Sequence, residues 1–397
     1  MSSVLRHPGV AALLALNVLA RIPTAGAGVL VVVHTHALTG SYAAAGAVAA
    51  AASLAMALAA PLLGGAVDRR GQTGVLVGSG LVAGAGYLAL ALLPHSAPVV
   101  AIAALAALAG GAQPPLGACL RTLWPGLLDH DETAIGTAFS LEAAVLELTY
   151  IAGPLGFLTL AALTSTRASM AVLGVLLTAG TVAFALRRES RAWRPHVHDV
   201  AAGAAPRARS ALAAPGVRTV VAIMGIVGVL IAGVEVSVAA ATHDAHAPGA
   251  TGPLLALWGV GSLIGGMIAA RAGGVQALSL VLAGLAVSHG ALALGASAIA
   301  VLAVLLVVAG AFIAPVFAAT SVLTGRVAPP GTITEAYSWT TTALAAGFGL
   351  GAAAAGVLID ASGPAPAFAA AGAIGLLAAA VAVVFVRAPA PARTVEA

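Results

Sequence analysis

The sequence predicts an all-helical membrane protein, with twelve transmembrane helices in two pseudo-symmetric bundles of six. Three observations support this fold class: an apolar composition, twelve apolar stretches, and residues that match about 200 positions apart. Of the 397 residues, 61% are hydrophobic and 8% are charged, whereas a soluble domain carries about 25% charged residues. Lipid tolerates so apolar an outer surface, and water does not.

Twelve apolar stretches are separated by polar or Pro/Gly-rich breaks. The first, residues 10–33, exceeds the roughly 20 residues needed for a crossing. Arg21 in its middle is foreign to the apolar core of a signal peptide, so we interpret the stretch as a retained helix. The others lie at residues 42–66, 74–93, 98–120, 136–162, 167–186, 217–241, 251–270, 275–296, 298–325, 333–358 and 365–386.

The arginines predict the orientation. All seventeen basic residues are Arg, and only Arg21 and Arg167 lie away from one side of the predicted topology. Basic residues concentrate on the cytoplasmic side of membrane proteins. We therefore expect both termini in the cytoplasm. The polar stretch 187–216 is expected to be a solvated cytoplasmic linker between bundles at 1–186 and 217–397.

The two halves carry matched residues at nearly constant spacing. Gly110 and Pro115 in the fourth stretch correspond to Gly310 and Pro315 in the tenth. Leu63-Gly64-Gly65 corresponds to Ile264-Gly265-Gly266 in the same way. Duplicated halves of this kind place a substrate near the midplane, at the interface between the repeats.

The segment Gly64-Gly65-Ala66-Val67-Asp68-Arg69-Arg70-Gly71 resembles the loop 2–3 signature of the major facilitator superfamily, G-x-x-x-D-R-x-G. Gln72 stands where the family has a basic residue. The resemblance implies the family's two-bundle fold and a bacterial cell-membrane location. It also implies a charged cluster that braces the cytoplasmic closure of the two halves. Its expected members are Gly64, Asp68, Arg69, Gly71, Arg121, Glu142 and Glu335.

The fifth stretch contains Gly153-Pro154-Leu155-Gly156. This resembles the end of the Gly-Pro signature of exporters in the same family. The alternative is a proline kink in an ordinary membrane helix. The whole chain is similar to bacterial twelve-helix drug or sugar efflux facilitators, which implies export of a small compound.

Ionisable residues at membrane depth are costly and mark functional positions. Arg21 and Glu147 both lie roughly 15 Å from the predicted cytoplasmic surface. We expect them to pair or to share a ligand, and to couple transport to protons; a static ion pair is the alternative. Glu142 and Arg121 are expected to pair nearer the cytoplasm, and Glu235 is a further cavity candidate. His289 is expected to be structural.

Asn17, Gln113 and Trp258 are candidate lining residues of a substrate cavity, with core packing as the alternative. The expected function is proton-coupled export of a small amphipathic or hydrophobic compound by alternating access. Alternatives are a proton symporter importing a sugar, nucleoside or organic acid, and a membrane scaffold or sensor. No nucleotide-binding loop or catalytic spacing appears in the sequence, so an enzyme is not expected. The expected partners are a small-molecule substrate, protons and the lipid bilayer. No cofactor, metal or nucleic acid is expected, and the chain is expected to be monomeric.

Overall fold

The computed structural model describes residue 7 and residues 9–129, 131–193, 210–271, 278–329 and 332–387. All secondary structure within these ranges is helical. Eleven helical segments are long and apolar enough to cross a membrane, and one further helix has the apolar part Leu148–Leu163. Together they correspond in order to the twelve stretches read from the sequence. Only helices satisfy every backbone polar group within a single segment in lipid.

The first bundle consists of the helices that precede residue 187. They are α2 (Val10–Thr39), α3 (Tyr42–Arg70), α4 (Gln72–Leu92), α5 (Val99–Gly111), α6 (Leu116–Leu127), α7 (Glu132–Leu163) and α8 (Thr166–Ala185). The short helix α9 (Arg188–Ala192) follows them.

The second bundle begins after the stretch 194–209, which lies outside the described residues. Its helices are α10 (Pro215–Asp244), α11 (Thr251–Arg271), α12 (Leu278–Gly290), α13 (Ile299–Gly310), α14 (Ile313–Val327), α15 (Ile333–Ser362) and α16 (Pro364–Arg387). Three short 3₁₀ helices connect them: η1 (Ala211–Ala213), η2 (Pro248–Ala250) and η3 (Ala291–Gly295).

The fourth and the tenth crossings are both broken near their middle. In the first bundle the break between α5 and α6 contains Pro114 and Pro115, which lack the N–H that a continuous helix needs. Before each break a glycine meets a backbone of the neighbouring helix. A Cβ at Gly110 would overlap the Ala52 carbonyl, and one at Gly310 would overlap the Trp258 carbonyl. The matched glycines therefore make the same kind of contact in both bundles.

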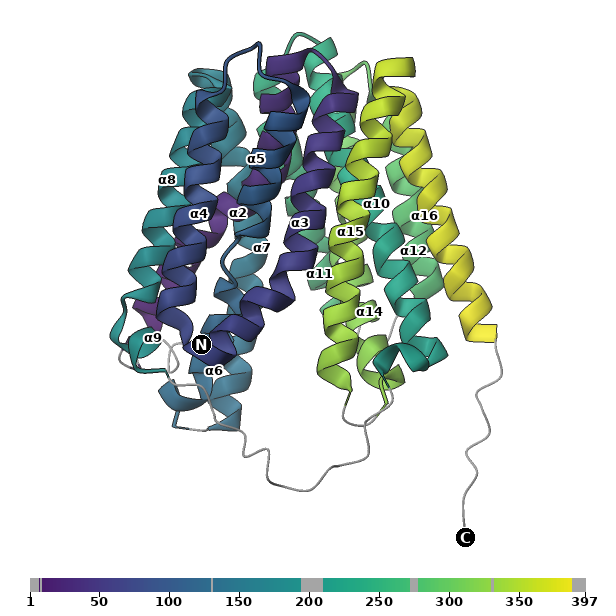
Figure 1. The fold of residues 1–397 in the computed structure, drawn as a ribbon. Helices are drawn as coiled ribbons and strands as arrows, with labels where there is room; N and C mark the ends of the chain where they lie inside the picture. Colours follow the sequence, from purple (N-terminus) through teal and green to yellow (C-terminus); the bar gives the residue numbers. More distant parts are fainter. Residues whose placement is uncertain are drawn as a thin grey trace.

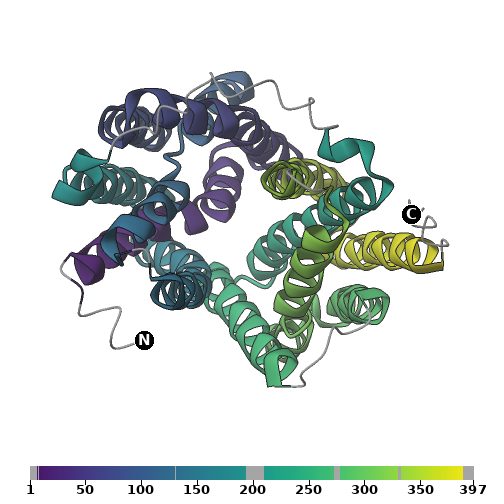
Figure 2. The same ribbon diagram turned by 90° about the horizontal axis from the view of Figure 1, so that it is seen from below.

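The two bundles stand side by side (Figure 1). We call the end where α2 begins and α16 ends the lower end, as drawn there, and the opposite end the upper end. Toward the lower end the bundles separate, and α6 and α14 lie apart in the side view and in the view from below (Figures 1 and 2). The close glycine contacts between the bundles lie in the upper half.

Two helix pairs form most of the contact between the bundles. On one side α3 packs against α15, where Gly46 faces the Ala352 carbonyl and Gly356 faces the Tyr42 carbonyl. On the other side α7 packs against α11, where Gly252 lies against Leu155 and Leu158. All of these residues belong to the upper halves of their helices. Small residues let membrane helices approach closely, and we call this contact region the upper seam.

Candidate functional site

Three charged side chains from three helices of the first bundle meet in its lower half. The Glu142 carboxylate on α7 lies 3.1 Å from Arg121 Nε on α6 and 3.4 Å from Arg21 Nη1 on α2. Arg121 Nε donates to both oxygens, at 3.1 and 3.2 Å. We call these three residues the Arg–Glu–Arg cluster.

Two glycines bring the cluster together by letting α2 and α7 approach. A Cβ at Gly153 would lie 2.7 Å from both the Gly26 nitrogen and the Ile22 oxygen. A Cβ at Gly26 would lie 2.8 Å from the Gly153 oxygen. Backbone atoms cannot move aside as a side chain can, so this crossing requires glycine. The Gly153-Pro154 pair, noted in the sequence as an exporter signature or a kink, thus marks the contact between the first and the fifth crossing.

A third glycine accommodates the Arg21 guanidinium. A Cβ at Gly117, in the first turn of α6, would lie 2.9 Å from Arg21 Nη1 and 3.4 Å from its Cζ. Glycine at this position therefore leaves the space that the guanidinium occupies. Sequence reasoning missed Gly117, because the signal for it is only a glycine two residues after Pro115.

Exposure differs sharply within the cluster. The Glu142 side chain is 3% exposed, whereas Arg21 is 20% and Arg121 is 54% exposed. A buried carboxylate is stable only with paired charges and hydrogen bonds. Two guanidinium groups meet one carboxylate, so the described side chains of the cluster carry one positive charge in excess.

The predicted pair of Arg121 and Glu142 is present in the structure. For Arg21 the partner found is Glu142, whereas Glu147 was expected. The Glu147 side chain lies outside the described residues, so that expectation stays a prediction. Glu147 follows Glu142 by five residues, about 140° around α7 and roughly 7.5 Å further along its axis.

The three candidate cavity residues make contacts within the bundles, and their role in a substrate cavity stays a prediction. Asn17 is 2% exposed, and its Nδ2 donates to the Leu116 oxygen at 3.0 Å. Gln113 Nε2 donates to the Tyr87 hydroxyl at 3.3 Å. Asn17 therefore holds the start of α6 next to α2, and Gln113 ties the break between α5 and α6 to α4.

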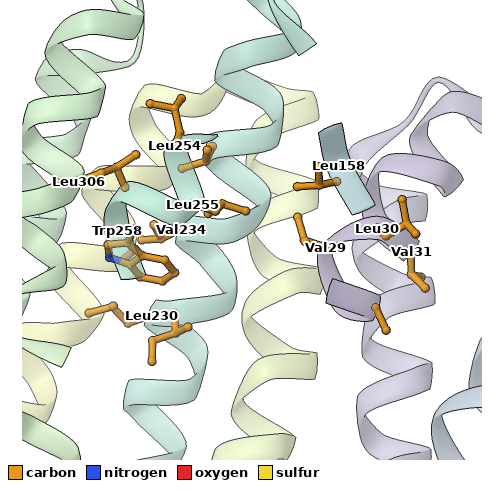
Figure 3. Packing of buried hydrophobic residues seen from close by; sticks show 14 of the residues in the cluster. Val29, Leu30, Val31, Leu158, Leu230, Val234, Leu254, Leu255, Trp258 and Leu306 are labelled. Carbon is orange, nitrogen blue, oxygen red and sulfur yellow. The ribbon is translucent and has the colours of Figure 1, made fainter. Parts of the chain in front are cut away.

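Trp258 is buried inside the second bundle. It is 6% exposed and lies among apolar side chains that include Leu230, Val234 and Leu306 (Figure 3). Its Nε1 donates to His289 Nε2 at 3.1 Å, and His289 Nδ1 lies 2.7 Å from the Leu285 oxygen. His289 therefore makes the structural contacts expected of it, inside the second bundle.

Glu235 does not join the Arg–Glu–Arg cluster. It lies on α10 between the buried residues Val234 and Val236. Counted from the lower end of its helix, it lies nine residues further than Arg21, a difference of roughly 14 Å. Within the described chain, the Glu235 carboxylate has no hydrogen bond or ion pair.

The loop between α3 and α4 is partly as expected. Gly71 has φ of +85°, which favours glycine, and separates the two helices. An added Cβ at Gly64 would meet nothing within 4 Å, so this glycine makes no close helix contact. Asp68 and Arg69 are exposed and make no hydrogen bond or ion pair to any residue in the described ranges. The reason is that the lower ends of the bundles stand apart.

Glu335 is not in contact with this loop. Its carboxylate accepts from Ser210 Oγ at 2.8 Å and from the Ala211 N–H at 3.0 Å. It thus caps η1, which leads into α10 of its own bundle. Of the expected bracing cluster, Arg121 and Glu142 are paired, whereas Asp68, Arg69 and Glu335 make no contact with one another in the described ranges.

Gln72 has a role that the family comparison did not suggest. It is 1% exposed, and its Nε2 donates to the Cys119 oxygen and to Thr122 Oγ1 on α6. Its Oε1 accepts from Ser190 Oγ at 3.0 Å. Ser190 belongs to α9, so the start of the expected solvated linker is a helical turn that packs on the first bundle.

The upper seam contains a polar cluster that sequence reasoning missed. The Asp360 carboxylate on α15 accepts from Ser41 Oγ at 2.6 Å and from the N–H groups of Tyr42 and Ala43 at 2.8 and 2.9 Å. The Tyr42 hydroxyl donates to the Ala239 oxygen at 3.3 Å, and the Tyr42 ring stacks on His36 at 3.9 Å. An Asp near the end of one crossing and a Ser before another were the only sequence signals.

No protein-family model matches the sequence, and no curated protein matches it. Several solved structures match the fold. The nucleoside transporter NupG has a TM-score of 0.72 at 14% identity, with 95% of this chain and 98% of that chain covered. A POT family transporter in complex with 5-aminolevulinic acid has a TM-score of 0.72 at 11% identity, with coverages of 95% and 96%.

A peptide transporter POT in complex with sulfate has a TM-score of 0.69 at 15% identity, with 94% of this chain and 93% of that chain covered. At such identities the likeness concerns the fold. The fold predicted from the sequence, an all-helical membrane protein of two related six-helix bundles, is confirmed.

Proposed function

We propose that the protein is a secondary transporter that moves a small organic solute across the membrane by alternating access. The observation that carries the proposal is the asymmetry of the contact between the bundles. The upper seam is closed by glycine contacts and by Asp360, and the lower ends stand apart. With the lower end in the cytoplasm, as the arginines predict, this is an inward-open state.

The fold supports the proposal. The similar solved structures are those of nucleoside and peptide transporters, one of them holding 5-aminolevulinic acid. Transporters of this architecture bind substrate near the midplane between the repeats. In this chain Arg21 lies roughly 16 Å from the lower end of α2, near the middle of a bilayer core of about 30 Å.

We also propose that transport is coupled to protons. Glu142 is a buried carboxylate at membrane depth, and such groups serve proton relays in pumps and transporters. Its two arginine partners come from different helices, so a movement of α2 against α7 would change its charge environment. Glu147 and Glu235 stay predicted coupling residues. Glu142 is the acid for which two charged partners are described.

Whether the protein exports or imports its solute is decided by whether protons move against the solute or with it. Export in exchange for protons is our prediction from the partial Gly-Pro signature. Import with protons of a nucleoside, sugar or organic acid is the alternative, and the likeness to nucleoside and peptide transporters favours it at least as much.

The test is solute and proton flux in proteoliposomes that contain purified protein and an internal pH dye. The panel should include nucleosides, small organic acids and amphipathic dyes. We expect solute-dependent proton flux that is lost in Glu142→Gln and kept in Glu132→Gln, an exposed acid at the start of α7. Flux of no compound above protein-free liposomes would contradict the proposal. Solute flux without proton flux would contradict the coupling alone.

A further inference from the structure

We infer that the transported solute carries an anionic group, a carboxylate or a phosphate-type oxyanion, which binds to Arg21 and Arg121. The inference deepens the proposed function, because it names the chemical class of substrate that the Arg–Glu–Arg cluster would take.

The donors are in excess. A guanidinium has five N–H groups, and Arg121 uses only Nε to reach Glu142. The N–H groups of its two Nη atoms make no hydrogen bond to any described residue, and the side chain is 54% exposed. Arg21 makes one contact to Glu142, at 3.4 Å. Its other N–H groups make no hydrogen bond to any described residue. A planar fork of donors of this kind matches carboxylate and phosphate oxygens.

Among the described side chains of the cluster, the positive charge is also in excess. Among the described side chains, Glu142 is the only acid that forms an ion pair with either arginine. At membrane depth an uncompensated guanidinium is costly. An anionic group on the solute would supply the missing charge.

Gly117 supplies the space. Any side chain there would press on Arg21, since even a Cβ would come within 2.9 Å of Nη1. Glycine at this position therefore lets the guanidinium lie against α6 next to Glu142. On this reasoning Glu142 competes with the anion for the same N–H groups. Removing the Glu142 charge should strengthen anion binding, an effect that a purely structural ion pair does not predict.

The test uses inorganic sulfate as the probe, with purified protein in a neutral detergent and sodium chloride at matched ionic strength as the reference. Sulfate affinity is measured by calorimetry and by the shift of the thermal unfolding midpoint. We expect Arg21→Gln and Arg121→Gln to weaken binding at least about tenfold, as loss of a charged hydrogen bond implies. Glu142→Gln should tighten it by a few-fold. Arg121→Lys keeps the positive charge but lacks the planar fork of donors, so its sulfate affinity should lie between those of the wild type and Arg121→Gln.

The matched control is Arg326→Gln, which removes an exposed arginine from the corresponding broken helix α14. It should leave sulfate affinity unchanged. Equal sulfate responses in the wild type, Arg121→Gln and Arg326→Gln would show an adventitious ion only and would overturn the inference. So would the absence of sulfate binding in both the wild type and Glu142→Gln.

An anionic lipid headgroup has the same chemistry, and nanodiscs separate the two sources. Sulfate binding is compared in phosphatidylcholine nanodiscs with and without phosphatidylglycerol. If phosphatidylglycerol competes with sulfate and this competition requires Arg121, the lipid headgroup occupies the site. That result would overturn the inference that the anion belongs to the transported solute. Flux of neutral solutes without Arg121-dependent sulfate binding would also contradict this inference. It would leave the proposed transport function supported. Arg121-dependent binding without flux of any solute would leave the anion site standing and contradict the transporter.

Discussion

The Asp360 carboxylate lies 2.8 Å from the Tyr42 backbone nitrogen, so a side chain of the second bundle caps a helix of the first. The first N–H groups of a helix have no partner within the helix. Asp360 accepts from two of them in α3, and a negative charge is favourable at that end of a helix. Because the cap joins the two bundles, it must break whenever the upper seam opens.

We expect Asp360→Asn to shift the protein toward states with the upper end open. An exposed cap contributes about 1 kcal/mol or less, which corresponds to a few-fold change in population. The measurement is a spin-label distance between Ser96 and Ser297, two exposed residues of upper loops in opposite bundles. Both are changed to Cys in a Cys119→Ser background, since Cys119 is the only native cysteine.

The control for this experiment is Glu132→Gln at the lower end, which should leave the distance distribution as in the wild type. A longer Ser96–Ser297 component should appear in Asp360→Asn and grow further in Asp360→Ala, which accepts no hydrogen bond. Identical distributions in all variants would mean that the cap does not hold the upper seam closed.

A second prediction concerns Gly117. Gly117→Ala should leave the protein folded, because its Cβ meets the far end of a flexible side chain. It should lower the transport efficiency, kcat/KM, by about tenfold if the Arg21 guanidinium is moved by a few tenths of an ångström. Gly126→Ala in the same helix is the matched control, as its Cβ would meet nothing within 4 Å. Equal transport by the two variants would remove Gly117 from the site.

The crossings, the repeat and the Arg121–Glu142 pair could be predicted from the sequence. The length of an apolar stretch, the spacing of matched glycines and the depth of a residue along its helix can each be counted along the chain. It did not predict the Asp360 cap, which joins residues more than 300 positions apart. Nor did it predict that Arg21 would reach Glu142, since rotation of α2 against α7 depends on the Gly26–Gly153 contact. The loop signature could be recognised in the sequence. Which of its contacts form depends on whether the lower ends of the two bundles are together or apart.

The third prediction tests that helix contact. Gly153→Ala should destabilise the protein by about 1–3 kcal/mol, the range for overpacking, because the new Cβ meets the backbone of α2 at Gly26 and Ile22. It should also impair transport, since Arg21 and Glu142 move apart with their helices. Gly156→Ala, one turn further along α7 and facing open space, should do neither. Thermal unfolding in detergent and solute flux are measured on both; a wild-type melting temperature for Gly153→Ala would refute the close contact.

The fourth prediction separates packing from substrate binding at Trp258. Trp258→Phe keeps the aromatic ring but leaves His289 Nε2 without its donor. An unsatisfied buried polar atom costs about 1–3 kcal/mol, so the melting temperature should fall. The KM for the solute should stay within about twofold, because the ring packs among Leu230, Val234 and Leu306 inside the second bundle. A large change in KM with an unchanged melting temperature would return Trp258 to the candidate cavity.

The last prediction concerns the energetics of the Arg–Glu–Arg cluster. Glu142→Gln should lower stability by about 1–3 kcal/mol, less than a fully buried pair would lose, because Arg121 is half exposed. Arg121→Gln should cost less, since Glu142 keeps Arg21. In the double variant the two losses should not add, because both substitutions remove the same interaction. The thermal unfolding midpoints of the four proteins give the coupling energy. Additive losses would show that the 3.1 Å contact contributes nothing to stability, and that Glu142 is held by Arg21 and by burial alone.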